Sequence, residues 1–175
     1  MRHVLSLAIA LVVFGCTDAR SAAPLHVTRV HIVKKSHRLE LISSTSEGER
    51  VVKWYRVAIG PGGDGPKTRE GDKITPTGHY VLAAARPSAK FRTFIAVSYP
   101  NDVDRKRFAS LQASGAIPKD ATIGGDIGIH GVGNAALGPF HKLADWTRGC
   151  VAVDNEEIDE IAALVPCGTP IDIED

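Results

Sequence analysis

Short stretches of alternating apolar and polar residues, separated by turns, constrain the fold of this chain more than any other feature. The segment from His26 to Val33 alternates in this way, and further β-type runs follow at 38–42, 51–59, 79–85, 94–98, 123–130, 151–153 and 170–173. A period of two residues is typical of strands that bury one face. Between 60 and 78, six glycines and three prolines occur among nineteen residues, so we expect a long irregular loop there.

Two other segments have the signals of helices. Asn101 is a favoured N-cap residue, and it precedes a segment with a sparse apolar face that extends to about Gln112. Asp154 and Glu157 predict a capping box at the start of a second helix. The apolar residues of this second helix recur at helical spacing: Ile158, Ile161, Ala162 and Val165. Seven or eight short strands with two short helices predict a mostly β domain, built as a sandwich or as a partly closed barrel.

The composition is that of an ordinary globular protein. Of 175 residues, 43% are hydrophobic and 23% are charged, which suffices for one domain with its own core. The formal net charge of +1 and the lack of a basic cluster argue against nucleic acid as a partner. We expect a monomer that binds no nucleic acid.

The first twenty residues predict an export signal rather than a part of the fold. A positively charged start precedes an apolar run from Val4 to Phe14, which is too short to cross a bilayer and has the character of a signal peptide. The tetrapeptide at 13–16 resembles a bacterial lipobox, in which Cys16 is lipidated. The alternative is ordinary cleavage after Ser21 or Ala23. We therefore expect the protein in the periplasm or cell envelope, with a lipid anchor through Cys16 as one option.

A histidine and a cysteine lie where β-type runs meet the loop between them. His130 ends one apolar run and Cys150 precedes the next, so they form a candidate general base and nucleophile. A thiol attacks a carbonyl only as the thiolate, and an unperturbed cysteine is mostly protonated at neutral pH. His141, in the intervening loop, is a weaker alternative base. A non-catalytic cysteine and histidine would have the same spacing, so spacing alone does not decide the role.

Neighbouring residues could assist this chemistry. The charge of Arg148 would favour the thiolate, and main-chain N–H groups around Gly149 and Cys150 could hold an oxyanion. Either Asp126 or the carbonyl of Gly131 could orient the imidazole of His130.

The order of these residues resembles a known signature. His130-Gly131, followed after a gap by Thr147-Arg148-Gly149-Cys150, is similar to the signature of the L,D-transpeptidase catalytic domain (YkuD-type), which has His, a gap and then Ser/Thr-His-Gly-Cys. The segment 75–78 looks like the TPxG turn of that family, and the resemblance covers residues 26–174. Arg148 stands where the family usually has histidine, and Ala152 stands where it often has arginine.

The resemblance implies an exported cysteine acyltransferase that acts on peptidoglycan stem peptides, in cell wall biogenesis and cell shape. It implies a thioester on Cys150, His130 as base, Gly131 as main-chain orienter, Gly149 at the oxyanion hole, and Thr147 with Arg148 at the substrate site. No metal and no cofactor are expected. A peptidoglycan hydrolase of the L,D-carboxypeptidase or amidase type, a wall-binding lipoprotein without activity and a zinc peptidase remain as alternatives.

Two further observations concern charge and thiols. Lys67, Arg69 and Lys73 in the glycine-rich loop could attract a carboxylate, although solvated loop charge is the default interpretation. Cys167 lies in a turn after the second helix and is interpreted as a structural thiol, with a bridge to Cys150 as the lesser alternative.

Overall fold

The computed structural model describes residues 26–133, 138 and 140–175, so the predictions for the signal segment and for Cys16 lie outside the described residues. The described residues form nine strands and two helices. Their bounds are β1 (Arg29–Val33), β2 (Arg38–Thr45), β3 (Gly48–Arg56), β4 (Gly78–Val81), β5 (Arg86–Ser88), β6 (Arg92–Ala96), α1 (Asp102–Ala113), β7 (Gly128–His130), β8 (Val151–Ala152), α2 (Asn155–Leu164) and β9 (Pro170–Glu174).

The strands form two sheets, in the orders β3-β2-β1-β9-β4 and β5-β6-β7-β8. Most neighbouring strands are antiparallel, but β1 pairs with β9 and β7 pairs with β8 in parallel. Isolated bridges between Ala58 and Ala152 and between Leu82 and Val97 connect the two sheets. The sheets are arranged as a sandwich and not as a closed barrel, which confirms the predicted mostly β fold with two helices.

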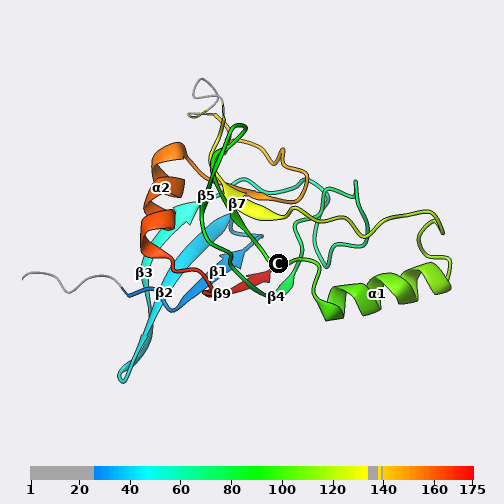
Figure 1. The fold of residues 1–175 in the computed structure, drawn as a ribbon, viewed down its shortest axis with the longest axis horizontal. Helices are drawn as coiled ribbons and strands as arrows, with labels where there is room; N and C mark the ends of the chain where they lie inside the picture. Colours follow the sequence, from blue (N-terminus) through cyan, green and yellow to red (C-terminus); the bar gives the residue numbers. More distant parts are fainter. Residues whose placement is uncertain (1–25, 134–137, 139) are drawn as a thin grey trace, which may run out of the picture.

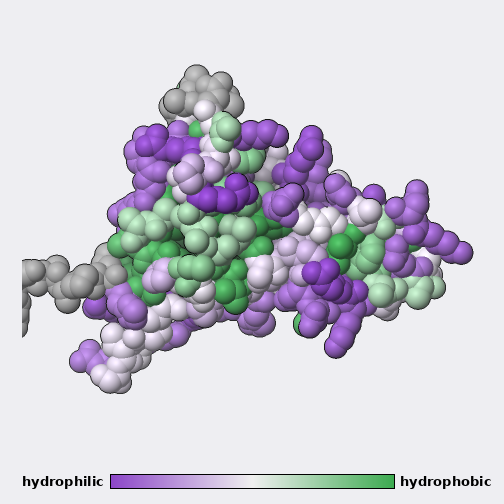
Figure 2. Space-filling model, in the orientation of Figure 1, coloured by the Kyte–Doolittle hydropathy of each residue, from purple (hydrophilic) through white to green (hydrophobic). Residues whose placement is uncertain are grey.

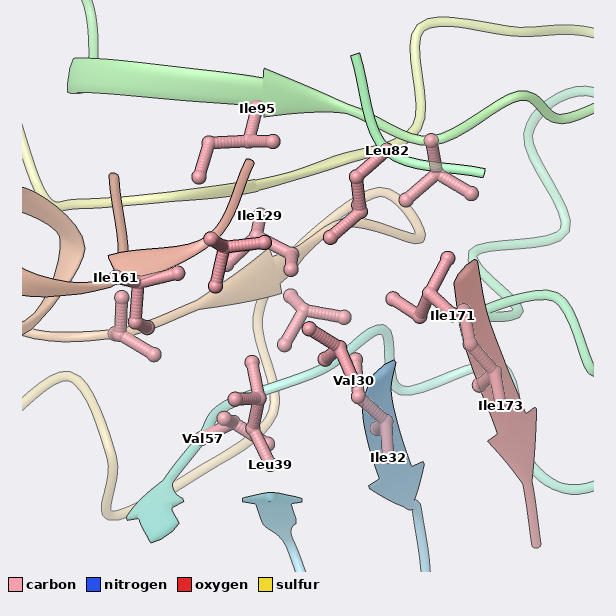
Figure 3. Close-up of a cluster of buried hydrophobic side chains, with 14 of the residues drawn as sticks. Val30, Ile32, Leu39, Val57, Leu82, Ile95, Ile129, Ile161, Ile171 and Ile173 are labelled. Carbon is pink, nitrogen blue, oxygen red and sulfur yellow. The ribbon is translucent and has the colours of Figure 1, made fainter. Parts of the chain in front are cut away.

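Aliphatic side chains from both sheets and from α2 meet in one core (Figure 3). Alternation along β1 buries Val30 and Ile32 completely, as the sequence pattern predicted. Ile129 of β7 and Ile161 of α2 are equally buried and point into the same cluster. Full burial of such a side chain stabilises the fold by about 1.5–3 kcal/mol. The short strands that carry the candidate site are therefore fixed on a rigid base.

Helix α2 braces the second sheet, because it packs against β6 and β7. The helix begins with the predicted capping box, in which the main-chain N–H of Asp154 donates to Oε2 of Glu157 at 2.9 Å. Ile158 and Ile161 are fully buried, and this face of the helix covers the core. The predicted second helix is thus confirmed.

Helix α1 lies at the opposite end of the molecule from α2 (Figure 1). Oδ1 of Asn101 accepts from the main-chain N–H groups of Val103 and Asp104 at 2.9 and 3.1 Å, so the predicted N-cap is confirmed. Figure 2 shows a hydrophobic area over the middle of the sheets, whereas hydrophilic residues surround a smaller hydrophobic patch at the α1 end. Neither α1 nor α2, the helices of the described residues, is long and apolar enough to cross a membrane.

Several strand predictions were wrong in their bounds: the run 79–85 forms a strand only to Val81, and β5 (Arg86–Ser88) was not predicted. The polar segment 43–50 was expected to be a turn, but β2 continues to Thr45 and β3 begins at Gly48. Polar residues there mark exposure to solvent rather than a loss of pairing, and the positive φ of Gly48 (117°) allows the short turn. The run 123–130 forms a strand only from Gly128, because Gly124 and Asp126 have positive φ angles.

Candidate active site

Strands β7 and β8 place the histidine and the cysteine side by side. His130 is the last residue of β7 and Cys150 directly precedes β8, and the parallel register pairs Ile129 with Val151 and His130 with Ala152. Continued by one residue, this register sets Cys150 opposite Gly128, two residues before His130. The two side chains then lie on the same face of the sheet, roughly 7 Å apart along the strand direction. Both line a single pocket.

The imidazole of His130 is buried and oriented. Its Nδ1 lies 2.7 Å from the carbonyl oxygen of Gly131, which can only accept a hydrogen bond. Nδ1 therefore carries the hydrogen, and Nε2 of the neutral ring keeps a lone pair that can accept a proton. The ring stacks on Phe91, with ring centroids 4.1 Å apart, and meets the edge of Trp146. Burial lowers the pKa of His130, so the neutral, basic form persists to lower pH than in a free histidine.

The thiol of Cys150 is half-buried and in its protonated form at rest. Its Sγ lies 3.4 Å from the main-chain oxygen of Asp126 and can donate to it. Burial raises the pKa of Cys150, and the charge of Asp126 acts in the same direction. A main-chain hydrogen bond from Gly128 and the charge of Lys67 act in the opposite direction. A base is therefore needed to produce the thiolate at neutral pH.

The turn before Cys150 is held by Thr147. Its buried hydroxyl donates to the carbonyl of Cys150 at 2.7 Å and accepts from the N–H of Gly149 at 3.1 Å. Gly149 has a φ of 119°, and a Cβ there would lie 2.8 Å from the carbonyl oxygen of Ile74. Only glycine fits this position without strain. Arg148, which lies between Thr147 and Gly149 in the sequence, has an exposed side chain and lines the pocket.

Two residues without a sequence signal anchor the same loop. Oδ1 of Asp145 accepts from the N–H of Ile59 at 3.0 Å, while its other oxygen lies 3.0 Å from Nε2 of His37. The carbonyl of Ile59 accepts from the N–H groups of Trp146 and Thr147, both at 3.1 Å. Because His37 and Asp145 are 108 residues apart, no local pattern marks the pair.

The pocket has a volume of about 1040 Å³. More basic than acidic residues line it. The two acidic residues are Glu70 and Asp126, and the five basic residues are Lys67, Lys73, Arg86, Lys90 and Arg148. Lys67 and Lys73 come from the glycine-rich loop, whereas Arg69 is exposed and does not line the pocket. An excess of positive charge favours an anionic ligand.

The other sequence candidates lie elsewhere. His141 is buried outside this pocket, with Nε2 2.8 Å from Oδ1 of Asp154. Cys150 and Cys167 are both free, and Cys167 is exposed, so the structure does not contain the bridge considered from the sequence. Within 26–133, 138 and 140–175, no three His, Cys, Asp or Glu side chains come together as metal ligands.

Comparison with known proteins identifies the class to which this fold and site belong. The model of the YkuD family, the L,D-transpeptidase catalytic domain, matches residues 27–173. The chain belongs to this family, which confirms the resemblance seen in the sequence.

Among curated proteins, the chain is 28% identical over 138 residues to a protein of Escherichia coli (strain K12) named "Putative L,D-transpeptidase YafK". The match covers 78% of this chain and 46% of YafK, so the chain spans about half the length of the curated relatives it matches.

Solved structures show the same fold. The helical cell shape determining protein Pgp2 from Campylobacter jejuni superposes with a TM-score of 0.64 at 24% identity, over 85% of this chain and 48% of Pgp2. Bd1075 from Bdellovibrio bacteriovorus gives a TM-score of 0.60 at 22% identity, over 86% of this chain and 48% of Bd1075. An L,D-transpeptidase from Mycobacterium smegmatis gives 0.51 at 12% identity, over 84% and 58% of the two chains.

Proposed function

We propose that the protein is an exported cysteine acyltransferase that acts on peptidoglycan stem peptides. The observation that carries this proposal is the shared pocket of Cys150 and His130, in a chain whose family is the L,D-transpeptidase catalytic domain. The mutual position of a thiol and a neutral, oriented imidazole is what covalent acyl transfer requires. No cofactor enters the proposed reaction.

The first half-reaction forms a thioester. Nε2 of His130 takes the proton of the Cys150 thiol, and Sγ attacks the carbonyl carbon of the peptide. Main-chain N–H groups of Gly149 and Cys150 hold the oxyanion. The N–H of Gly149 donates to Thr147 in the resting structure, so it must exchange that bond in the transition state. The protonated His130 then gives its proton to the departing amine, and an acyl-enzyme remains.

The second half-reaction depends on the acceptor. An incoming amine gives transpeptidation, with His130 as base again, and water gives hydrolysis. Hydrolysis is the second candidate because of two departures from the family signature. Arg148 replaces the usual histidine, and Ala152 is a fully buried residue of β8 whose main chain pairs with Ala58. A position that often carries arginine in the family thus offers no charge to a substrate.

The location follows from the same proposal. A family that acts on the cell wall requires a place outside the cytoplasm, and the relatives include a protein described as determining helical cell shape. We propose export to the periplasm or envelope, with Cys16 as the site of a lipid anchor. Metabolic labelling with a radioactive fatty acid should mark the wild-type chain and not the Cys16→Ser variant. Equal membrane retention of an unlabelled chain would contradict the anchor.

The decisive experiment is incubation of the purified protein with defined wall peptides, followed by mass analysis of products and protein. We expect an acyl adduct on Cys150, together with either a cross-linked or a shortened peptide, in the presence of a chelator as well as in its absence. Cys150→Ala should abolish the adduct and the product. Cys167→Ala is the matched control, since this exposed thiol lies outside the pocket, and it should react like wild type.

The result that would overturn the mechanism is full turnover by Cys150→Ala. Binding of wall peptides without any adduct or product in wild type would instead favour a wall-binding protein without activity.

A further inference from the structure

One lysine of the active-site pocket differs from the other basic residues that line it. Lys67 is buried, with only 3% of its side chain exposed, whereas Lys73, Arg86, Lys90 and Arg148 are exposed. Burial of an ammonium group has a large desolvation cost unless partners replace the lost water. A buried cation in the wall of an active-site pocket therefore needs an explanation beyond solvated loop charge.

Asp72 holds Lys67 in place, but it accepts only one of the hydrogen bonds that the ammonium group can donate. Nζ of Lys67 donates to Oδ1 of Asp72 at 2.5 Å. The same carboxylate accepts from the main-chain N–H groups of Thr68, Arg69 and Ile74 at 2.8–3.0 Å. Although burial acts to raise it, these hydrogen bonds bring the pKa of Asp72 below its usual value. Asp72 is thus an ionised anchor within the loop.

An ammonium group has three N–H donors. Among the described residues, Lys67 Nζ makes one hydrogen bond, which is the bond to Asp72. Two donors remain for a ligand in the pocket that Lys67 lines together with Cys150 and His130. The charge of Lys67 also acts on the Cys150 thiol, so the two groups are within electrostatic range.

We propose that Lys67 is the residue that binds a carboxylate of the substrate beside Cys150, with Asp72 as the residue that positions it. A carboxylate supplies the acceptor oxygens and the negative charge that the two unused N–H donors require. The inference deepens the proposed function and rests on it, because it assigns to the attacked peptide a free carboxylate close to the carbonyl. The exposed cations of the pocket draw such a ligand in, and Lys67 fixes its position.

The test compares two small reagents that react with the same thiolate. Iodoacetate and iodoacetamide both form an Sγ–carbon bond and release iodide, but only iodoacetate carries a carboxylate. The ratio of their rate constants at Cys150, measured in the Cys167→Ala background, cancels any change in the Cys150 pKa. We expect Lys67→Met to lower the ratio of iodoacetate to iodoacetamide about tenfold, as for the loss of one charge-assisted hydrogen bond.

Matched variants show whether an effect comes from the position of the Lys67 charge, from the net charge of the protein or from a loss of folding. Arg69→Met removes one positive charge from the same loop outside the pocket, and it should change the ratio less than about twofold because exposed charges are screened. Lys67→Met with Asp72→Asn avoids an unpaired buried carboxylate and should reproduce the tenfold loss. Urea unfolding checks that each variant is folded. An unchanged ratio in both Lys67 variants, or an equal loss in Arg69→Met, would refute the assignment.

A peptide experiment distinguishes failure of this inference from failure of the proposed function. Acyl-enzyme formation is measured with one wall peptide that has free carboxylates and with its amidated form. Wild type should prefer the free acid about tenfold, and Lys67→Met should lose this preference. Equal reaction with both peptides in wild type would overturn the carboxylate site while leaving acyl transfer intact. If neither peptide forms an adduct, but Lys67→Met still lowers the ratio of iodoacetate to iodoacetamide, the acyl transfer alone would be overturned.

Discussion

Replacement of Gly149 by alanine should damage the active site in a way that can be separated from ordinary glycine strain. Gly149 has a φ of 119°, and Gly48 in the β2–β3 turn has a nearly equal φ of 117°. A Cβ at Gly48 would meet nothing within 4 Å, whereas one at Gly149 would lie 2.8 Å from the carbonyl oxygen of Ile74 and 3.1 Å from Cδ1 of Ile127. The two positions share the backbone strain and differ in steric contact.

The expected magnitudes follow from this difference. Unfavourable φ costs about 1–3 kcal/mol of unfolding free energy in either variant. Overpacking against Ile74 adds about 1–3 kcal/mol to Gly149→Ala alone. Urea unfolding monitored by tryptophan fluorescence should therefore show a larger loss of stability in Gly149→Ala than in Gly48→Ala.

Activity should separate the two variants further. Relief of the contact with Ile74 shifts the turn that carries Cys150, and a displacement of about 1 Å in an active site can lower the rate about a hundredfold. The rate of acyl-enzyme formation should fall in Gly149→Ala and stay near wild type in Gly48→Ala. Equal losses of stability in the two variants, with an unimpaired Gly149→Ala enzyme, would refute the claim that the main chain of Ile74 excludes a side chain here.

Two further predictions concern ionisation. Because burial raises the pKa of Cys150, its alkylation by iodoacetamide should reach half-maximal rate above about pH 8.5, the value of a free cysteine. Arg148 lines the same pocket, so Arg148→Ala should move this midpoint higher and Arg148→Lys should restore it. A midpoint below that of a free cysteine, or one that does not change in Arg148→Ala, would contradict this. The pKa of Asp72 is lowered in the fold, so its stabilisation is present above the unfolded pKa of about 4 and is lost as pH falls through the folded pKa. Asp72→Asn should therefore lose about 3–5 kcal/mol at pH 7, where it leaves Lys67 unpaired, and progressively less as the pH falls through the folded pKa of Asp72. A loss of the same size at every pH at which the protein is folded would show that the ion pair is not the cause.

Local patterns in the sequence were sufficient for much of the fold. The N-cap of α1 could be predicted because Oδ1 of Asn101 accepts from the nearby N–H groups of Val103 and Asp104, and the buried residues of β1 follow from strict alternation. These features depend on neighbours in the chain, so short windows contain the information. The bounds of β2 and β3 could not be predicted, because pairing between strands, rather than polarity, decides where a strand ends.

The sequence by itself determined which residues are available for chemistry and the family to which the chain belongs. His130 and Cys150 were recognisable because an ordered motif surrounds them, and Gly149 because a turn next to a nucleophile favours glycine. Only the tertiary structure decided that Lys67 is buried in the pocket wall beside Asp72, and that His37 meets Asp145 from 108 residues away. The physical reason is that burial and long-range contacts arise when distant segments pack together, and no property of the segments alone fixes which of their polar groups remain without water.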